Sequence, residues 1–395
     1  MNALKKILNV LLILIGVVLI VVCADLVLNK TVKTDYGSLS DADQEALKQI
    51  ADVVVLFDDE YGNSDIWNES YNPNDNGCII TRKYGFVKGT SYVINADLSG
   101  NVFAQKIDMG EDYENVEVYR LACCTPQTIG MYFSSADNAA VTIDGEELFA
   151  MNYTSAVVSA DLEQNFVKTS FKQDVQTADY PTADIEVDFN LNSKNIALTG
   201  LQYRIIDDLR DASSIEEIKE LIAEYVIVRE YQLSGTPKLA LQQEKAELAE
   251  GCPQYVLYSV SSETGNDFTY FDKTSSNSID FYSAFYYICS GQYSADTQTY
   301  FNETGNMYVG AALCEILDEK AIIPNWRELL DSSTEDNFVS QYSLLKAYFE
   351  TSCGEYSGKS INDIQREYSF EEISSMAAVL IQNDNSKAAA QTSEK

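Results

Sequence analysis

Residues 214–232 read SIEEIKELIAEYVIVREYQ, and this stretch carries the clearest fold signal in the chain. Its apolar residues recur every three or four positions, which is the spacing of one face of an α-helix. These positions are Ile215, Ile218, Leu221, Ile222, Tyr225 and Val226. Ser214 and Glu217 form a capping-box pattern at the start, and Thr236-Pro237 ends this helix and opens the next. The stretch therefore predicts two consecutive helices.

The helical spacing continues over most of the chain after about residue 154. Further helices are predicted at residues 195–211, 239–260, 307–320, 337–350 and 369–381. The aromatic segment SIDFYSAFYYICSGQY at residues 278–293 is predicted to belong to the core, with the wall of a ligand groove as the alternative.

Upstream of this helical portion, short segments between about Cys78 and Met151 are rich in Val, Ile, Tyr and Phe and are separated by Gly, Asn and Asp. Such segments are typical of β-strands joined by tight turns, and about five or six of them predict a small, mostly antiparallel sheet. A β-rich portion followed by a helical portion indicates an α+β protein. The expected divisions are an anchor at 1–28, a stalk with a short helix capped by Ser40 at 29–60, a β-rich domain at 61–153, a helical domain at 154–382 and a disordered tail at 383–395.

The N-terminus carries a long apolar run, ILNVLLILIGVVLIVVCADLVL at Ile7–Leu28, which follows Lys5 and Lys6. As a helix this run is roughly 33 Å long, enough to cross the hydrocarbon core of a bilayer. The two lysines predict a cytoplasmic N-terminus and an extracytoplasmic remainder. The alternatives are a signal peptide that is removed and a lipoprotein signal acylated at Cys23. The predicted location is the cell membrane, with a single-pass anchor and the bulk of the chain at a bacterial cell surface.

The composition excludes several classes of site. The 395 residues include 61 acidic and 27 basic side chains, for a net charge of -34, and no histidine. Because His is the commonest general base and zinc ligand near neutral pH, Ser-His-Asp triads, Cys-His nucleophiles and histidine-ligated metal sites are excluded. The acidity argues against nucleic acid as a partner, since binding to phosphates depends on Lys and Arg. No metal or other cofactor is expected.

Seven of the eight cysteines follow the anchor, and an odd number leaves at least one thiol unpaired. Cys123 and Cys124 are adjacent in a strand-like stretch, where neighbouring side chains face opposite sides of a sheet. At most one of them is therefore expected to pair with Cys78. The alternative is that most of the cysteines are small buried hydrophobic residues.

Two helical stretches resemble the later helices of extracytoplasmic zinc peptidases of the gluzincin type. The first runs from Glu224 to Tyr258, and its Glu250, Gly251 and Tyr255 match an E-G-x-A-x-Y pattern in which Pro253 replaces the alanine. The second reads NETGNMYVGAALCEILDEKAIIPNWREL and supplies the remaining matches, which are Gly310, Ala311, Ala312 and Trp326.

In that family a zinc helix with the pattern His-Glu-x-x-His lies upstream. The corresponding stretch here, AVVSADLEQNF, has Ser159 and Glu163 at the two histidine positions and Ala160 at the position of the base. The resemblance therefore implies a gluzincin-like helical domain that has lost its metal and its chemistry. It also implies a degenerate site made of Ser159, Ala160, Glu163 and Glu250.

The predicted function is a membrane-anchored, catalytically inactive scaffold that binds a peptide, a cell-wall component or a partner protein. An exported hydrolase is the main alternative, because a glycosidase needs only two carboxylates about 5 to 9.5 Å apart and acidic pairs are plentiful in this chain. A structural envelope protein without a cleft is the third possibility.

Overall fold

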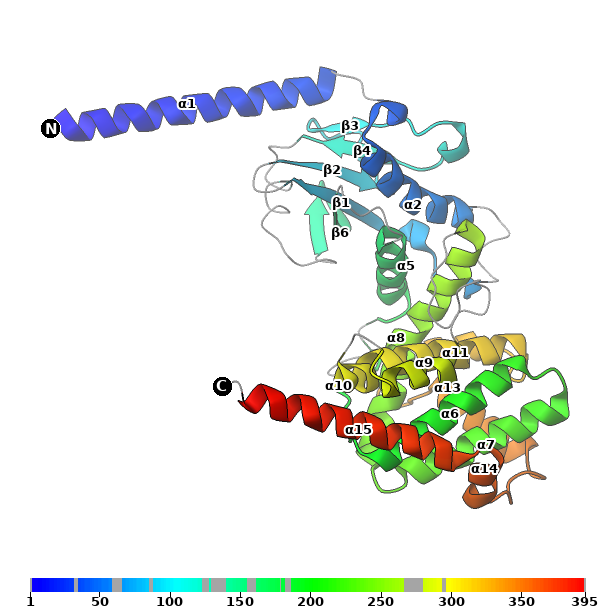
Figure 1. Ribbon diagram of the computed structural model, residues 1–395. Helices are drawn as coiled ribbons and strands as arrows, with labels where there is room; N and C mark the ends of the chain where they lie inside the picture. The colour runs from blue at the N-terminus through cyan, green and yellow to red at the C-terminus, as the bar shows by residue number, and fades with distance from the viewer. Residues whose placement is uncertain are drawn as a thin grey trace. The chain divides into compact units, whose positions relative to one another are not determined.

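The computed structural model describes residues 2–31, 35–58, 66–84, 88–122, 128, 140–154, 161–177, 179–181, 186–265, 280–292 and 296–393. The chain divides into two compact units, Met1–Asp174 and Val175–Lys395 (Figure 1). The sequence places this boundary at residue 154 instead. The difference arises because helix α5 (Asp161–Asp174) packs on the sheet of the first unit, where the rings of Phe166 and Phe149 stack with centroids 5.7 Å apart.

The first unit opens with the single helix α1 (Asn2–Thr31), which covers the predicted apolar run without a break. Its segment Lys6–Thr31 is long and apolar enough to span a membrane, and none of that segment's most apolar stretch is buried in the protein. The structure thus confirms the expected N-terminal apolar helix. Figure 1 shows it extending away from the rest of the first unit.

Helix α2 (Asp41–Asp58) follows α1 and the short turn η1 (Tyr36–Ser38). Ser40 caps α2 as predicted, because its Oγ accepts a hydrogen bond of 3.3 Å from the backbone N–H of Asp43. The predicted short helix is present, but it does not belong to an exposed stalk. Helix α2 buries an apolar face that includes Leu47 and Ile50. That face belongs to the core of the first unit.

The sheet of the first unit has six strands in the order β3-β4-β2-β1-β6-β5. The strands are β1 (Gly77–Tyr84), β2 (Lys88–Ile94), β3 (Ala104–Lys106), β4 (Val118–Leu121), β5 (Ala140–Ile143) and β6 (Glu146–Tyr153). The short turn η2 (Pro73–Asp75) precedes β1, and η3 (Glu111–Tyr113) lies between β3 and β4. Neighbouring strands are antiparallel except β1 and β6, which run parallel with Ile79 opposite Ala150. The small, mostly antiparallel sheet is therefore confirmed.

Side chains of the strands alternate between the two faces of this sheet. One face carries an apolar cluster that includes Ile79, Val93, Tyr119 and Leu148. The opposite face carries a buried charged pair, in which Arg82 Nη2 of β1 lies 2.8 Å from Asp43 Oδ2 of α2. The hydroxyl of Tyr153 on β6 donates to the other oxygen of Asp43. These polar contacts fix α2 on the sheet.

Cys78 lies on β1 as a buried free thiol. Its proposed partners, Cys123 and Cys124, lie outside the described residues. The described cysteines after the anchor are Cys78, Cys252, Cys289, Cys314 and Cys353, and all of them are buried. Their burial agrees with the interpretation of these cysteines as small hydrophobic residues.

The described part of the second unit is helical. Its helices are α6 (Ser193–Asp211), α7 (Ile215–Leu233), α8 (Pro237–Thr264), α9 (Phe281–Cys289), α10 (Thr297–Thr299), the π-helical turn η4 (Tyr300–Thr304), α11 (Gly305–Glu319), α12 (Trp326–Asp331), α13 (Gln341–Ser352), α14 (Ile361–Glu367) and α15 (Phe370–Ser393). Helices α7 and α8 begin where the sequence predicts, and Ser214 Oγ accepts a hydrogen bond of 3.2 Å from Glu217 N.

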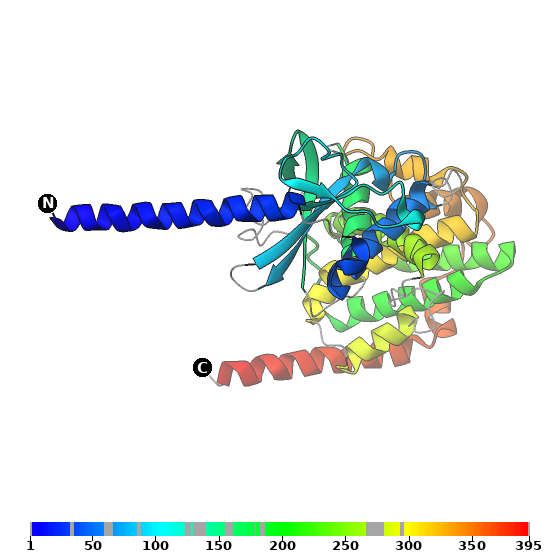
Figure 2. The ribbon, with the colours of Figure 1, turned by 90° about the horizontal axis from the view of Figure 1, so that it is seen from above.

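Two predictions about the second unit differ in detail from the structure. The backbone of α15 stays helical to Ser393, beyond the expected end at residue 383, because the added stretch contains strong helix formers such as Ala and Lys. The aromatic helix α9 buries Phe281 and Phe285 as predicted for a core segment, but Tyr286 and Tyr287 are exposed. Helix α15 packs along α6 and α9 (Figures 1 and 2).

Candidate functional site

The four predicted site residues fall in different parts of the chain. Ser159 and Ala160 lie outside the described residues. Glu163 lies on α5 in the first unit and is fully buried, so it is not a solvated acid. Glu250 lies on α8 in the second unit and is exposed. The degenerate peptidase site thus stays a prediction, and the described contacts of the second unit direct attention to other residues.

The glycines of the two resembling stretches meet where α8 crosses α11. A Cβ atom on Gly251 would lie 2.5 Å from the Cα of Gly310, and one on Gly310 would lie 2.1 Å from the backbone oxygen of Glu247. Such distances leave no space for a side chain at either position, so the two helix backbones are in direct contact. The crossing fixes the positions of the neighbouring residues on both helices.

The aromatic residues of the same stretches also come together, where α8 meets α12. The rings of Tyr255 and Trp326 pack edge to face with centroids 5.7 Å apart. The Tyr255 hydroxyl donates a hydrogen bond of 2.7 Å to Asp318 Oδ2, and Arg327 Nη2 lies 2.7 Å from Asp318 Oδ1. In the second unit these matched residues therefore pack against one another, while Glu250 faces solvent.

A buried ion pair joins α7 to α8 next to the crossing. The guanidinium of Arg229 contacts Glu247 with two parallel hydrogen bonds of 2.8 and 2.9 Å, and both side chains are 3% exposed. Tyr225 and Tyr342 enclose the guanidinium, which lies 4.3 Å from the ring centroid of Tyr342. Burial raises the pKa of Glu247, and the charge of Arg229 opposes that rise. The arrangement satisfies both charges internally.

A small cavity of about 20 Å³ lies beside this ion pair. Its polar lining includes Arg229, Glu247, Gln202, Gln232 and Asn306. Among the residues that the structure describes, Arg229 Nε is buried without a hydrogen-bond partner, whereas Gln232 Nε2 donates to the backbone oxygen of Asn195 and to Thr199 Oγ1. A volume of this size holds about one water molecule. The cavity is therefore too small for a substrate.

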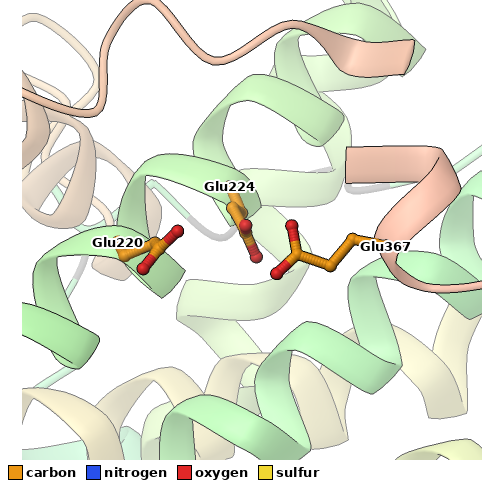
Figure 3. Close-up of side chains that lie close together, drawn as sticks. All are labelled: Glu220, Glu224 and Glu367. Carbon is orange, nitrogen blue, oxygen red and sulfur yellow. The ribbon is translucent and has the colours of Figure 1, made fainter. Parts of the chain in front are cut away.

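Three glutamate side chains converge in a second cluster, at the junction of α7 and α14 (Figure 3). Glu220 and Glu224 lie one helical turn apart on α7, and Glu367 ends α14. The ammonium of Lys359 binds all three: it lies 2.9 Å from Glu220 Oε1 and 2.8 Å from Glu367 Oε2, and it donates to Glu224 Oε1. Tyr368 donates a hydrogen bond of 2.9 Å to the other oxygen of Glu224.

The chemistry of this cluster follows from the position of the lysine. Oxygen atoms of the three carboxylates lie within 4.8 Å of one another, a spacing that suits a divalent cation. The ammonium of Lys359 already lies between them and supplies one positive charge. Burial raises the pKa of Glu224, although its bonds to Lys359 and Tyr368 lower it. The cluster consequently links α7 to α14 through ion pairs.

Among the described carboxylates of the second unit, Asp207 most resembles a general acid. Burial raises its pKa to about 7, although the backbone N–H groups of Tyr282 and Phe281 lower it. Both of its oxygens are occupied, since they accept hydrogen bonds of 2.9 and 2.8 Å from those two N–H groups at the start of α9. Asp207 therefore fixes the N-terminus of α9 on α6.

Sequence reasoning missed both charged clusters. Arg229 interrupts the apolar run YVIVREY of α7, and a charge on a buried helical face is a signal for an internal ion pair. The spacing of Glu220 and Glu224 places both on one helical face. No local pattern identifies Lys359 as their partner, because it lies 139 residues from Glu220 and 135 from Glu224.

Comparison of the chain with protein-family models, with curated proteins and with solved structures finds no match.

Proposed function

We propose that this chain is a single-pass membrane protein whose two units form a non-catalytic scaffold outside the cytoplasm. The scaffold binds a peptide, a cell-wall component or a partner protein. The observation that carries the proposal is the contact between the C-terminal end of α1 and the edge of the sheet. A helix that was removed as a signal peptide would not need such a contact in the mature protein.

This contact is made by polar groups directly after the apolar run. Asn29 Nδ2 donates a hydrogen bond of 3.0 Å to the backbone oxygen of Phe103, and Arg120 Nε donates one of 2.9 Å to Asn29 Oδ1. Lys30 Nζ donates to the backbone oxygen of Ala104 at 3.2 Å. Because the apolar run ends at Leu28, these bonds support a position of the β3–β4 edge at the surface of the membrane.

The described polar groups are engaged in internal contacts, which supports a non-catalytic role. Arg229 and Glu247 neutralise each other in the interior, and Lys359 binds three carboxylates. Asp207 is engaged with the backbone of α9. The whole chain contains no histidine that could act as a base near neutral pH. Recognition by the outer surface is the function that this arrangement supports.

The test uses the full chain in the cells that produce it. We expect the chain to remain in the membrane fraction after extraction at alkaline pH, to keep residues 1–28, and to be cut by protease added outside intact cells. The variant Leu14→Lys/Val18→Lys is the control, because two charges at mid-bilayer cost roughly 5 to 7 kcal/mol and should release the helix from the membrane. A mature chain that begins after residue 28, or one protected from external protease, would contradict the anchor.

The non-catalytic part of the proposal is tested separately. Purified full-length chain should contain no stoichiometric zinc by metal analysis and should leave panels of peptides and glycans intact. Reproducible cleavage that disappears in Glu163→Gln or Glu250→Gln would overturn it.

A further inference from the structure

Two cysteine thiols lie side by side in the interior of the second unit. Cys252 belongs to α8 and Cys314 to α11, and both residues are fully buried. Their sulfur atoms are 3.8 Å apart, although the residues are 62 positions apart in the sequence. The closeness of the two sulfurs results from packing between helices.

Three helices hold the two sulfurs in this position. Cys252 directly follows Gly251, and Cys314 lies one turn after Gly310 on the same face of α11, so both flank the backbone contact between α8 and α11. From α13, Gln341 Nε2 lies 3.2 Å from Cys252 Sγ and 3.5 Å from Cys314 Sγ. The same amide nitrogen donates to the backbone oxygen of Glu247 at 3.1 Å.

We propose that Cys252 and Cys314 are a disulfide pair that cross-links α8 to α11 wherever the chain folds in the presence of a disulfide oxidant. An S–S bond is about 2.05 Å long, so the sulfurs must approach by about 1.8 Å. Rotation of the side chains can supply much of this distance, because the helix backbones are already in contact at Gly251 and Gly310. Closure in the cell rests on the proposed function, since disulfides persist in extracytoplasmic compartments.

The cross-link forms by two thiol–disulfide exchanges with a small-molecule or protein disulfide as the oxidant. The Cys252 thiolate attacks one sulfur of the oxidant and releases the other as a thiol. The Cys314 thiolate then attacks the Cys252 sulfur of the mixed disulfide and releases the second thiol. The two cysteines lose two electrons, the oxidant gains them, and the two cysteine protons end on the released thiols.

The timing of this reaction follows from burial. In the folded unit no oxidant can reach either sulfur, and burial raises the pKa of the Cys252 thiol, which suppresses the reactive thiolate. Exchange therefore takes place during folding, as α8 and α11 come together and before their completed packing excludes the oxidant. Once closed, the bond is protected from small reductants by the same burial.

The experiment has two arms on the full chain. In the first, cells are treated with N-ethylmaleimide, and the denatured and digested chain is searched by mass spectrometry for a peptide pair that links Cys252 to Cys314. In the second, chain purified in reductant is unfolded and refolded in a glutathione redox buffer, and the same linked peptides are measured. We expect the linked pair in both arms.

The outcomes separate the inference from the proposed function. Linked peptides in the glutathione arm alone support the pair and contradict export to an oxidising compartment. Alkylation of both cysteines in both arms overturns the inference wherever the chain is located. A linkage that joins either cysteine to a different one overturns it as well.

Thermal unfolding of the second unit provides an independent readout. We expect the oxidised chain to unfold on the order of 10 °C above the reduced chain, because the cross-link closes a loop of about 60 residues. Cys252→Ala/Cys314→Ala should abolish this redox difference. The control Cys289→Ala, which removes another buried thiol of the same unit, should preserve it.

Discussion

In the second unit, a single lysine takes the place that a bound metal ion has in other proteins. This residue is Lys359, whose ammonium occupies the space between three carboxylates where a divalent cation could sit. Glu224 is 1% exposed at its side chain and depends on this charge, since an uncompensated buried carboxylate is costly. Lys359 is part of the chain and cannot be removed by a chelator, so its ion pairs with the three carboxylates do not depend on the metal concentration.

The variant Lys359→Met tests this interpretation. We expect it to lower the free energy of unfolding of the second unit by roughly 3 kcal/mol, because Glu224 loses its ion pair. Millimolar calcium should restore part of that loss, since the three carboxylates then form an open oxygen cluster. Unfolding can be followed by the fluorescence of Trp326 in a Trp67→Phe background, because the chain has two tryptophans, one in each unit.

Lys346→Met is the matched control for this measurement. Lys346 pairs with Glu230 at 2.9 Å, but both side chains are largely exposed, and such surface pairs contribute about 0 to 1 kcal/mol. A loss in Lys359→Met no larger than in Lys346→Met, or an equal response of both variants to calcium, would contradict the role given to Lys359.

The raised pKa of Asp207 predicts how the free energy of unfolding changes with pH. Its pKa is about 7 in the folded chain against an ordinary value of 3.8, so between these values the folded state holds a proton that the unfolded state has released. The contribution of Asp207 to the free energy of unfolding must then fall as pH rises through this window, by at most about 1.4 kcal/mol per pH unit. The free energy of unfolding is measured in urea at several pH values for the unmodified chain and for Asp207→Asn. The difference between the two chains at each pH isolates this slope.

Asp211→Asn removes the same charge from an exposed position on the same helix and serves as the control for Asp207. Equal pH slopes for the unmodified chain and Asp207→Asn would show that the carboxyl is not desolvated. The two backbone N–H bonds would then hold it ionised throughout the window.

At the scale of elements, the α8–α11 crossing is the contact that organises the second unit. It places the ion pair of Glu247, the thiol pair of Cys252 and Cys314, and the packing of Tyr255 around one line of backbone contact. Close approach of two helices requires residues without side chains at the crossing point. Gly251 and Gly310 therefore explain why these polar and sulfur groups meet.

The variant Gly310→Ala should disrupt this crossing. A Cβ atom at this position would lie 2.1 Å from a backbone oxygen, which cannot move without shifting α8. We expect the free energy of unfolding of the second unit to fall by roughly 3 kcal/mol. In Gly235→Ala the new Cβ would meet nothing within 4 Å, so this variant should stay within about 0.5 kcal/mol of the unmodified chain. Equal stability of the two variants in urea unfolding would refute the argument.

The elements also show how far sequence reasoning reaches. The start of α7 at Ser214 and of α8 at Pro237 were predictable because caps and helix-opening prolines are local signals. The parallel pairing of β1 with β6 was not, since strand periodicity does not identify a partner more than sixty residues away. The Lys359 cluster was missed for the same reason. The glycine match at Gly251 was found, but the sequence could not tell packing from catalysis.

At the scale of the whole molecule, the excess of 61 acidic over 27 basic residues bears on the proposed membrane location. Acidic surfaces are repelled by anionic headgroups, so in the proposed location the apolar helix provides the membrane attachment. The contact between α1 and the β3–β4 edge differs from the average surface, because Lys30 of α1 and Arg120 of β4 place two cationic side chains there. The adjacent Val102 and Phe103 are 67% and 37% exposed. These features suit a position at the level of the headgroups.

The variant Val102→Trp measures that position. In vesicles whose acyl chains are brominated near the headgroup, we expect its added fluorescence to be quenched by roughly half, because an apolar side chain at the interface sits some 5 to 10 Å deep. The unmodified chain gives the background, since Trp67 and Trp326 are buried in the protein. Adding Asn29→Ala removes the bonds that fix the edge to α1 and should reduce the quenching. Quenching no greater than the background, in a chain that still resists alkaline extraction, would show that the anchor holds but the sheet edge lies away from the bilayer.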